Sequence, residues 1–173
     1  EENHGCDPSE YLSQKWAFSV VDRCIVLEDD DVPSQSFFHF CTDLLDRYAD
    51  NPKVWMIAGF NALEVNSRKD SHPAPRTERV PDYFFTTVFS IWGWASWRRV
   101  TDTWDEHYTF LDDEDAVAKI QTLMDQGLLR RDFLRLCHEH RATGRAHYET
   151  IFWASMLLHD SLGVMPARNL INN

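Results

Sequence analysis

CIVLEDDD, at residues 24–31, combines four apolar residues with four acidic residues that follow without a break. An apolar run this short, with no polar face, is typical of a strand buried on both faces in a parallel sheet. We therefore predict a buried strand over residues 24–27. The acidic residues follow its carboxyl end, where ligands bind in open α/β sheets.

The sequence on both sides of this stretch predicts a β-α-β unit. Apolar residues four apart predict a helix over residues 9–21, before the strand. After the acidic run, Pro33 and Ser34 introduce a segment whose apolar residues follow the 3.6-residue helical period. Residues 54–58 then predict a second buried strand. A helix between two such strands predicts a right-handed crossover in a parallel sheet.

The rest of the chain shifts from strands to helices. Residues 61–82 are polar and contain three prolines, which predicts a long loop, and residues 83–89 predict a third strand. Further helices and an extended end are expected at residues 114–126, 128–141, 148–159 and from 163 onward. Together these segments predict an α/β fold in a single domain over residues 1–173.

Composition narrows the functional class. The chain carries 17 Lys and Arg against 28 Asp and Glu, a net charge of −11, which argues against a general nucleic-acid binder. Its apolar runs are far shorter than the roughly 20 residues of a membrane span, and residues 1–4 do not resemble a secretory signal. The four cysteines have no C-x-x-C spacing. We expect reduced thiols in a cytoplasmic protein, although four cysteines also permit three disulfide pairings.

The acidic run is the first candidate site. Adjacent carboxylates repel one another, so their clustering at a strand end is best explained by a bound cation. Oxygen ligands favour a hard ion, Mg²⁺ or Mn²⁺, which can also bind phosphate oxygens. The alternative is a solvated acidic turn in which Asp31 or Ser34 caps the next helix.

Two further segments could contribute to chemistry. Residues 90–97 contain three tryptophans, with Gly93 between Trp92 and Trp94. Their rings could shape a sugar pocket, but tryptophan is highly buried on average, so core packing is the alternative. Glu149 lies where a late helix is expected to begin, and a carboxylate there could act as a general base. Its alternative role is a favourable interaction with the helix dipole.

Several blocks, in order along the chain, resemble one family. The matching blocks are residues 3–6, 25–30, 33–38, 57–61, 92–99 and 166–173. They are similar to the central and C-terminal parts of bacterial GT-A-type glycosyltransferases, which are nucleotide-diphospho-sugar transferases. The resemblance implies a GT-A-like, Rossmann-like fold without its first βα units. Family members continue at both ends, so the missing segments could come from another part of a longer chain.

The resemblance also implies roles for individual residues. Glu28-Asp29-Asp30 matches the family's D-x-D-type motif, which implies that Asp30, with Glu28, binds Mn²⁺ or Mg²⁺. Glu28, Asp29 and Asp31 would then contact the nucleotide-sugar donor. Glu149 stands where the family tends to place a catalytic Asp, and the exchange of Asp for Glu is a departure from the family's pattern.

These features lead to one expected function and two alternatives. The expected function is metal-dependent transfer of a sugar from a nucleotide-diphosphate donor to a hydroxyl of a carbohydrate or another acceptor. A non-catalytic GT-A-like domain that binds carbohydrate or protein is the first alternative. A metal-dependent phosphohydrolase is less well supported, because the sequence offers no second cluster of ligands for a second ion.

Overall fold

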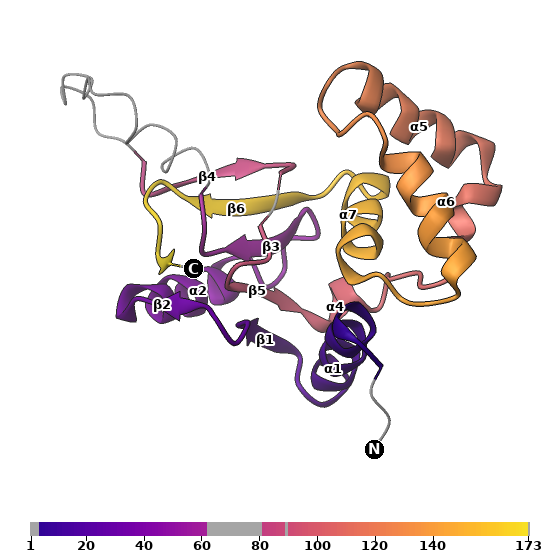
Figure 1. Ribbon diagram of the computed structural model, residues 1–173. Coiled ribbons are helices and arrows are strands. Elements are labelled where there is room, and N and C mark those ends of the chain that lie inside the picture. The colour runs from indigo at the N-terminus through magenta and orange to yellow at the C-terminus, as the bar shows by residue number, and fades with distance from the viewer. Residues whose placement is uncertain (1–3, 62–80, 89, 173) are drawn as a thin grey trace. The chain divides into compact units, whose positions relative to one another are not determined.

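The computed structural model describes residues 4–61, 81–88 and 90–172 (Figure 1). It divides the chain into two compact units. The helical unit comprises Glu1–Asp22 and Arg98–Ser161, and the sheet unit comprises Arg23–Trp97 and Leu162–Asn173. The expected single domain stays a prediction, and most of the expected loop at 61–82 lies outside the described residues.

The sheet unit contains a five-stranded mixed sheet. Its strands are β1 (Arg23–Val26), β3 (Val54–Ala58), β4 (Tyr83–Thr86), β5 (Trp94–Trp97) and β6 (Leu162–Pro166), in the order β1-β5-β3-β6-β4. Only the pair β3 and β6 is parallel among the described strands, and the other neighbours are antiparallel. Two short strands, β2 (Val32–Pro33) and β7 (Ile171–Asn172), form a separate antiparallel pair. The predicted α/β class is confirmed, and the mixed sheet is compatible with a Rossmann-like fold.

The prediction of a strand buried on both faces at residues 24–27 is wrong. β1 is the first strand in the sheet order, and its residues are half-buried or exposed. It pairs with β5, which also pairs with β3, so Ala95 lies opposite both Ile25 and Ile57. β5 therefore lies between the two strands of the predicted β-α-β unit. The apolar run of β1 reflects one covered face and one strand partner.

The core of the sheet unit forms around β3, whose five residues are all buried, as predicted. Helix α2 (Gln35–Arg47) packs against β3 and β5 through its apolar face. The buried residues of α2 are Phe37, Cys41, Leu44 and Leu45. Ser96 is fully buried on β5, and its hydroxyl donates a 2.6 Å hydrogen bond to the carbonyl of Trp55, so this buried hydroxyl is paired.

The helical unit is organised around α7 (Tyr148–Leu158), which is buried on most of its surface. Its other elements are α1 (Cys6–Val20), α4 (Arg98–Thr101), the 3₁₀ helix η1 (Thr109–Asp112), α5 (Glu114–Asp125) and α6 (Phe133–Thr143). Trp104 packs on Tyr148 and Phe152 of α7, with ring centroids 5.7 and 5.1 Å apart. A helix that is apolar on nearly all sides is expected in such a central position.

The expected helices of this unit are confirmed, with differences at their ends. α5 begins as predicted because Asp113 caps it, accepting hydrogen bonds from the backbone of Asp115 and Ala116. α6 begins at Phe133 rather than 128, since the preceding turn includes Gly127 at φ +71°. No helix within the described ranges is long and apolar enough to cross a membrane.

Candidate functional site

The acidic run forms a closed turn directly after β1. The backbone N–H of Glu28 donates a 3.0 Å hydrogen bond to Oδ2 of Asp31, and the backbone N–H of Asp31 donates to the carbonyl of Glu28 at 3.3 Å. Ser34 occupies the N-cap position of α2, but its side chain makes no capping bond. The side chain of Asp31 therefore fixes its own turn and does not cap the helix. Asp29 and Asp30 remain exposed on this turn.

One oxygen of this turn has no partner. Oδ1 of Asp31 is buried and accepts no hydrogen bond from any described residue. A buried acceptor without a partner costs free energy, especially on a group that can carry charge. A cation or a ligand donor at this oxygen would remove that cost. The surrounding oxygen-only donor set fits a hard divalent ion.

The carboxylates of the turn are not gathered around one point. Within the described ranges, the one group of three potential ligands whose atoms lie within 4.8 Å of one another is Cys6, Asp7 and Glu10, in the helical unit. A cation at the turn would therefore have to draw the exposed carboxylate of Asp30 towards it. The turn offers suitable ligands without a preformed ligand cage.

The tryptophan segment, residues 90–97, lies at the same end of the sheet as the acidic turn. Val26, the last residue of β1, lies opposite Trp94, the first residue of β5. Because the two strands are antiparallel, residues after Val26 and residues before Trp94 lie at the same edge. A Cβ added to Gly93 would come within 3.3 Å of the Leu27 side chain. The structure thus places Gly93 beside Leu27, the residue directly before the acidic turn.

The two tryptophans of this segment have different environments. Trp94 is 1% exposed and belongs to the core of the sheet unit, so the packing alternative describes it. Trp92 is 37% exposed, and its ring meets the Phe60 ring edge-on at a centroid distance of 4.5 Å. Gly93 between them has φ +58°, and its carbonyl accepts a 2.7 Å hydrogen bond from the backbone of Gly59. Trp92 is the ring of the pair with surface to offer a ligand.

Glu149 lies in the first turn of α7, in the helical unit, and its side chain is exposed. Neighbouring atoms nevertheless displace part of its hydration, which is the largest cause of a raised pKa. The negative charge of Asp7 raises the pKa of Glu149 further, while Arg130 opposes the shift. Burial, Asp7 and Glu149 together also raise the pKa of Glu10, against the effect of its hydrogen bond from Cys6. The predicted base therefore belongs to a group of neighbouring carboxylates.

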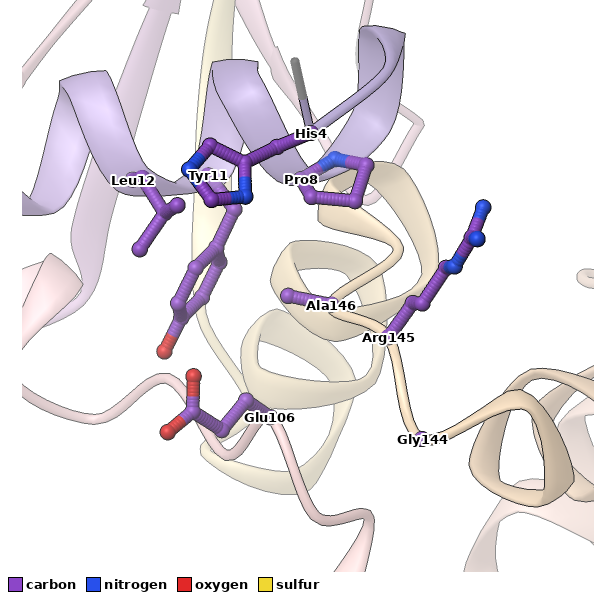
Figure 2. A pocket seen from close by; sticks show the side chains of 8 residues that line it. All are labelled: His4, Pro8, Tyr11, Leu12, Glu106, Gly144, Arg145 and Ala146. Carbon is purple, nitrogen blue, oxygen red and sulfur yellow. The ribbon is translucent and has the colours of Figure 1, made fainter. Parts of the chain in front are cut away.

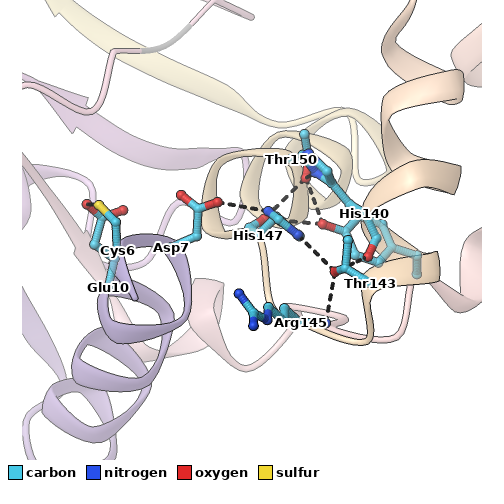
Figure 3. Close-up of polar contacts among 9 residues, drawn as sticks. Cys6, Asp7, Glu10, His140, Thr143, Arg145, His147 and Thr150 are labelled. Atoms are coloured by element: carbon cyan, nitrogen blue, oxygen red, sulfur yellow. Dashed lines mark hydrogen bonds and ion pairs between the residues drawn. The ribbon is translucent and has the colours of Figure 1, made fainter. Parts of the chain in front are cut away.

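A histidine network adjoins these carboxylates (Figure 3). His147, immediately before α7, pairs through Nδ1 with Oδ2 of Asp7 at 2.8 Å. Its ring stacks on that of His140, with centroids 3.8 Å apart. His140 in turn lies 2.8 Å from the hydroxyl of Thr150, which lies 2.7 Å from that of Tyr108. Burial and the neighbouring imidazole of His147 lower the pKa of His140.

The sequence did not reveal this network. Asp7 and His147 are 140 residues apart, and no spacing motif links them. The one local signal is the position of His147 just ahead of Glu149 at a helix start. The nearby Cys6, Asp7 and Glu10 are accounted for without an ion, because Cys6 donates to Glu10 and Asp7 is paired with His147.

The predicted site residues therefore lie in two places. Six of them follow β1 or precede β5 at one end of the sheet, namely Glu28, Asp29, Asp30, Asp31, Trp92 and Gly93. Glu149 lies in the helical unit. Each group is defined within its own unit. In comparisons with known proteins, the chain matches no protein-family model, and no curated protein matches it.

Proposed function

We propose that the chain transfers a sugar from a nucleotide-diphosphate donor to an acceptor hydroxyl, with a divalent cation at the acidic turn. The observation that carries this proposal is the unpartnered, buried Oδ1 of Asp31 among exposed carboxylates at the carboxyl end of β1. The colinear resemblance to GT-A-type glycosyltransferases supports the sugar-transfer chemistry.

The turn supplies the binding half of the reaction. Asp30 and Glu28 would hold Mn²⁺ or Mg²⁺, whose charge, when bound, stabilises the leaving diphosphate. The Asp31 side chain accepts a hydrogen bond from the backbone of Glu28 and so keeps the turn closed. This bond fixes the backbone from which the side chains of Glu28 and Asp30 extend. Asp29 is exposed and free to accept hydrogen bonds from hydroxyls of the donor. The exposed ring of Trp92, at the same edge of the sheet, offers an apolar face for a sugar.

Glu149 would remove the proton from the acceptor hydroxyl. A general base works best when its pKa lies near the working pH. The loss of hydration around Glu149 and the charge of Asp7 shift its pKa in that direction. His147, held by Asp7 at the start of α7, supports the turn that presents Glu149.

A non-catalytic binding domain is the second candidate. It is favoured by the dispersed carboxylates of the turn, which could bind a sugar or protein partner without a metal cage. The two candidates differ in whether a nucleotide diphosphate binds only when a divalent cation is present.

Calorimetry can test this difference with UDP, GDP, ADP and dTDP, each with Mn²⁺ and each with EDTA. We expect at least one nucleotide to bind only with Mn²⁺, and Asp30→Asn to abolish that binding. Asp50→Asn is the matched control, because Asp50 is an exposed acidic residue of the same unit outside the turn. Unchanged affinity in Asp30→Asn, or no metal-dependent binding by the wild type, would contradict the proposed function.

A further inference from the structure

A cavity of about 340 Å³ opens in the helical unit beside the first half of α1 (Figure 2). One wall is formed by Pro8, Tyr11 and Leu12 of α1. Glu106 and the loop at 144–146, between α6 and α7, complete it. This cavity contains none of the residues assigned to the cation or to the proposed base, and its volume suits a small ligand.

The polar side of the cavity is built from a buried tyrosine and a carboxylate. Tyr11 is 3% exposed, and its hydroxyl interacts with the carboxylate of Glu106. Burial, followed by the charge of Glu106, raises the pKa of Tyr11, so this hydroxyl remains a donor. Figure 2 shows the Tyr11 hydroxyl and the Glu106 carboxylate facing each other. Because Tyr11 is buried in this unit, the carboxylate of Glu106 has a fixed polar neighbour.

Glu106 keeps capacity to bind a ligand. The carboxylate has four lone-pair sites, of which the Tyr11 hydroxyl can occupy one at most. The structure gives Glu106 one basic neighbour among the described residues, the His107 imidazole, whose Nε2 lies 3.8 Å from Oε1 of Glu106, and the Glu106 side chain is 45% exposed. The carboxylate can therefore accept further hydrogen bonds from donors in the cavity.

Another part of the lining is aliphatic. Pro8, Leu12 and Ala146 present aliphatic surface, and Leu12 is 47% exposed. His4 covers one end with its ring, while Arg145 extends away from the centre of the cavity in Figure 2. A ligand here would meet the Glu106 carboxylate on one side and C–H surface on another.

We propose that this cavity binds one neutral sugar unit. A pyranose has hydroxyl donors along its edge and an aliphatic C–H face, which match Glu106 and the aliphatic wall respectively. Next to Tyr11, Glu106 and Asp105, whose charge also reaches Tyr11, disfavour a phosphate or a carboxylate, while Arg145 is the cationic residue of the lining. The loop at 144–146 leads into α7, which carries the proposed base Glu149. The bound sugar would therefore be the acceptor, and this assignment as acceptor rests on the proposed function.

Saturation-transfer NMR and calorimetry can test the cavity with glucose, galactose, mannose and N-acetylglucosamine, in EDTA and without nucleotide. We expect at least one sugar to bind saturably. Glu106→Ala should weaken that binding at least about tenfold, since hydrogen bonds to charged groups contribute most to such contacts. Tyr11→Phe keeps the ring but frees the carboxylate, and should weaken binding less. Glu114→Gln, an exposed acidic change in the same unit, should leave binding unchanged.

Two results would overturn the proposal: no saturable binding of any of the four sugars, or unchanged affinity in a folded Glu106→Ala variant. Its melting curve establishes folding, and Tyr11→Phe provides a second test at the same contact. Asp30→Asn separates the two proposals. Sugar binding in EDTA should persist in this variant, so failure of metal–nucleotide binding at the turn would leave the sugar site standing.

Discussion

The acidic turn of the sheet unit and the carboxylate–histidine network of the helical unit are built in opposite ways. The turn consists of four consecutive residues, held by hydrogen bonds between Glu28 and Asp31, and its other carboxylates are exposed. The network joins Asp7 to His147 across 140 residues, and its imidazoles are stacked and paired. The turn is open for a ligand to organise, whereas the network already has its partners. Cation binding is therefore expected at the turn, and proton transfer beside the network.

The largest effect expected from this division is on turnover. Glu149→Gln keeps the size of the side chain but cannot accept a proton, so the rate of sugar transfer should fall roughly 10²–10⁴-fold. Metal-dependent nucleotide binding should be unchanged, because the turn lies in the other unit. Steady-state kinetics and calorimetry on the same variant measure both. Turnover within a few-fold of wild type would make Glu149 structural and direct the search to Asp102, Asp105 and Glu106.

Trp94→Ala tests whether the ring beside the acidic turn stabilises the core of the sheet unit. Trp94 is 1% exposed in the sheet core, and truncating a buried aromatic residue costs about 3–5 kcal/mol of unfolding free energy. Trp92→Ala, the matched change at a 37% exposed position, should cost far less and should weaken donor binding instead. Urea denaturation followed by circular dichroism measures the unfolding free energy of both variants. Equal losses of stability would show that the two rings share one packing role.

Added metal should distinguish the two regions directly. A ligand that binds only the folded state stabilises it by about 2.7 kcal/mol at a concentration a hundredfold above Kd. We expect Mn²⁺ to raise the melting temperature of the wild type and of Cys6→Ser, but not that of Asp30→Asn. EDTA should reverse the increase. If Cys6→Ser abolishes the increase while Asp30→Asn retains it, the cation binds the helical unit and the assignment to the turn is wrong.

Local patterns predicted much of this structure, and long-range pairing explains what they missed. α2 and β3 were predicted because their burial is encoded in their own period or apolar run. β5 was not predicted, because Trp94–Trp97 has no alternation and is buried throughout. Its insertion between β1 and β3 then makes β1 a half-exposed strand. Strand preference depends on such neighbours, which a single sequence does not specify.

The candidate site divides in the same way. The acidic turn could be located because its residues are contiguous and follow an apolar run. The roles within it were less visible, since the bond from the backbone of Glu28 to Asp31 depends on the turn's geometry. The pairing of His147 with Asp7 requires α1 and the start of α7 to meet, which no local spacing records.

The smallest expected effect is on the pH dependence of stability, through the carboxylate of Glu10 beside the histidine network. Burial, then Asp7 and Glu149, raise the pKa of Glu10 above its value in the unfolded chain. The folded state therefore binds the Glu10 proton more tightly than the unfolded state does. The associated stabilisation is complete below the unfolded pKa, about 4.3 for Glu, and is lost as pH rises through the folded pKa.

Glu10→Gln removes this titration while its side-chain carbonyl can still accept the hydrogen bond from Cys6. We expect the variant to be more stable than wild type at pH 7 by a few tenths of a kcal/mol, because solvent screens a half-buried charge. The difference should disappear below about pH 4, where the wild-type carboxyl is protonated in both states. Asp30→Asn, in the exposed turn and without added metal, provides the comparison. Denaturation of the three proteins at pH 4 and pH 7 measures the change, and a Glu10→Gln variant less stable than wild type at pH 7 would show that this carboxylate is a favourable partner of the network.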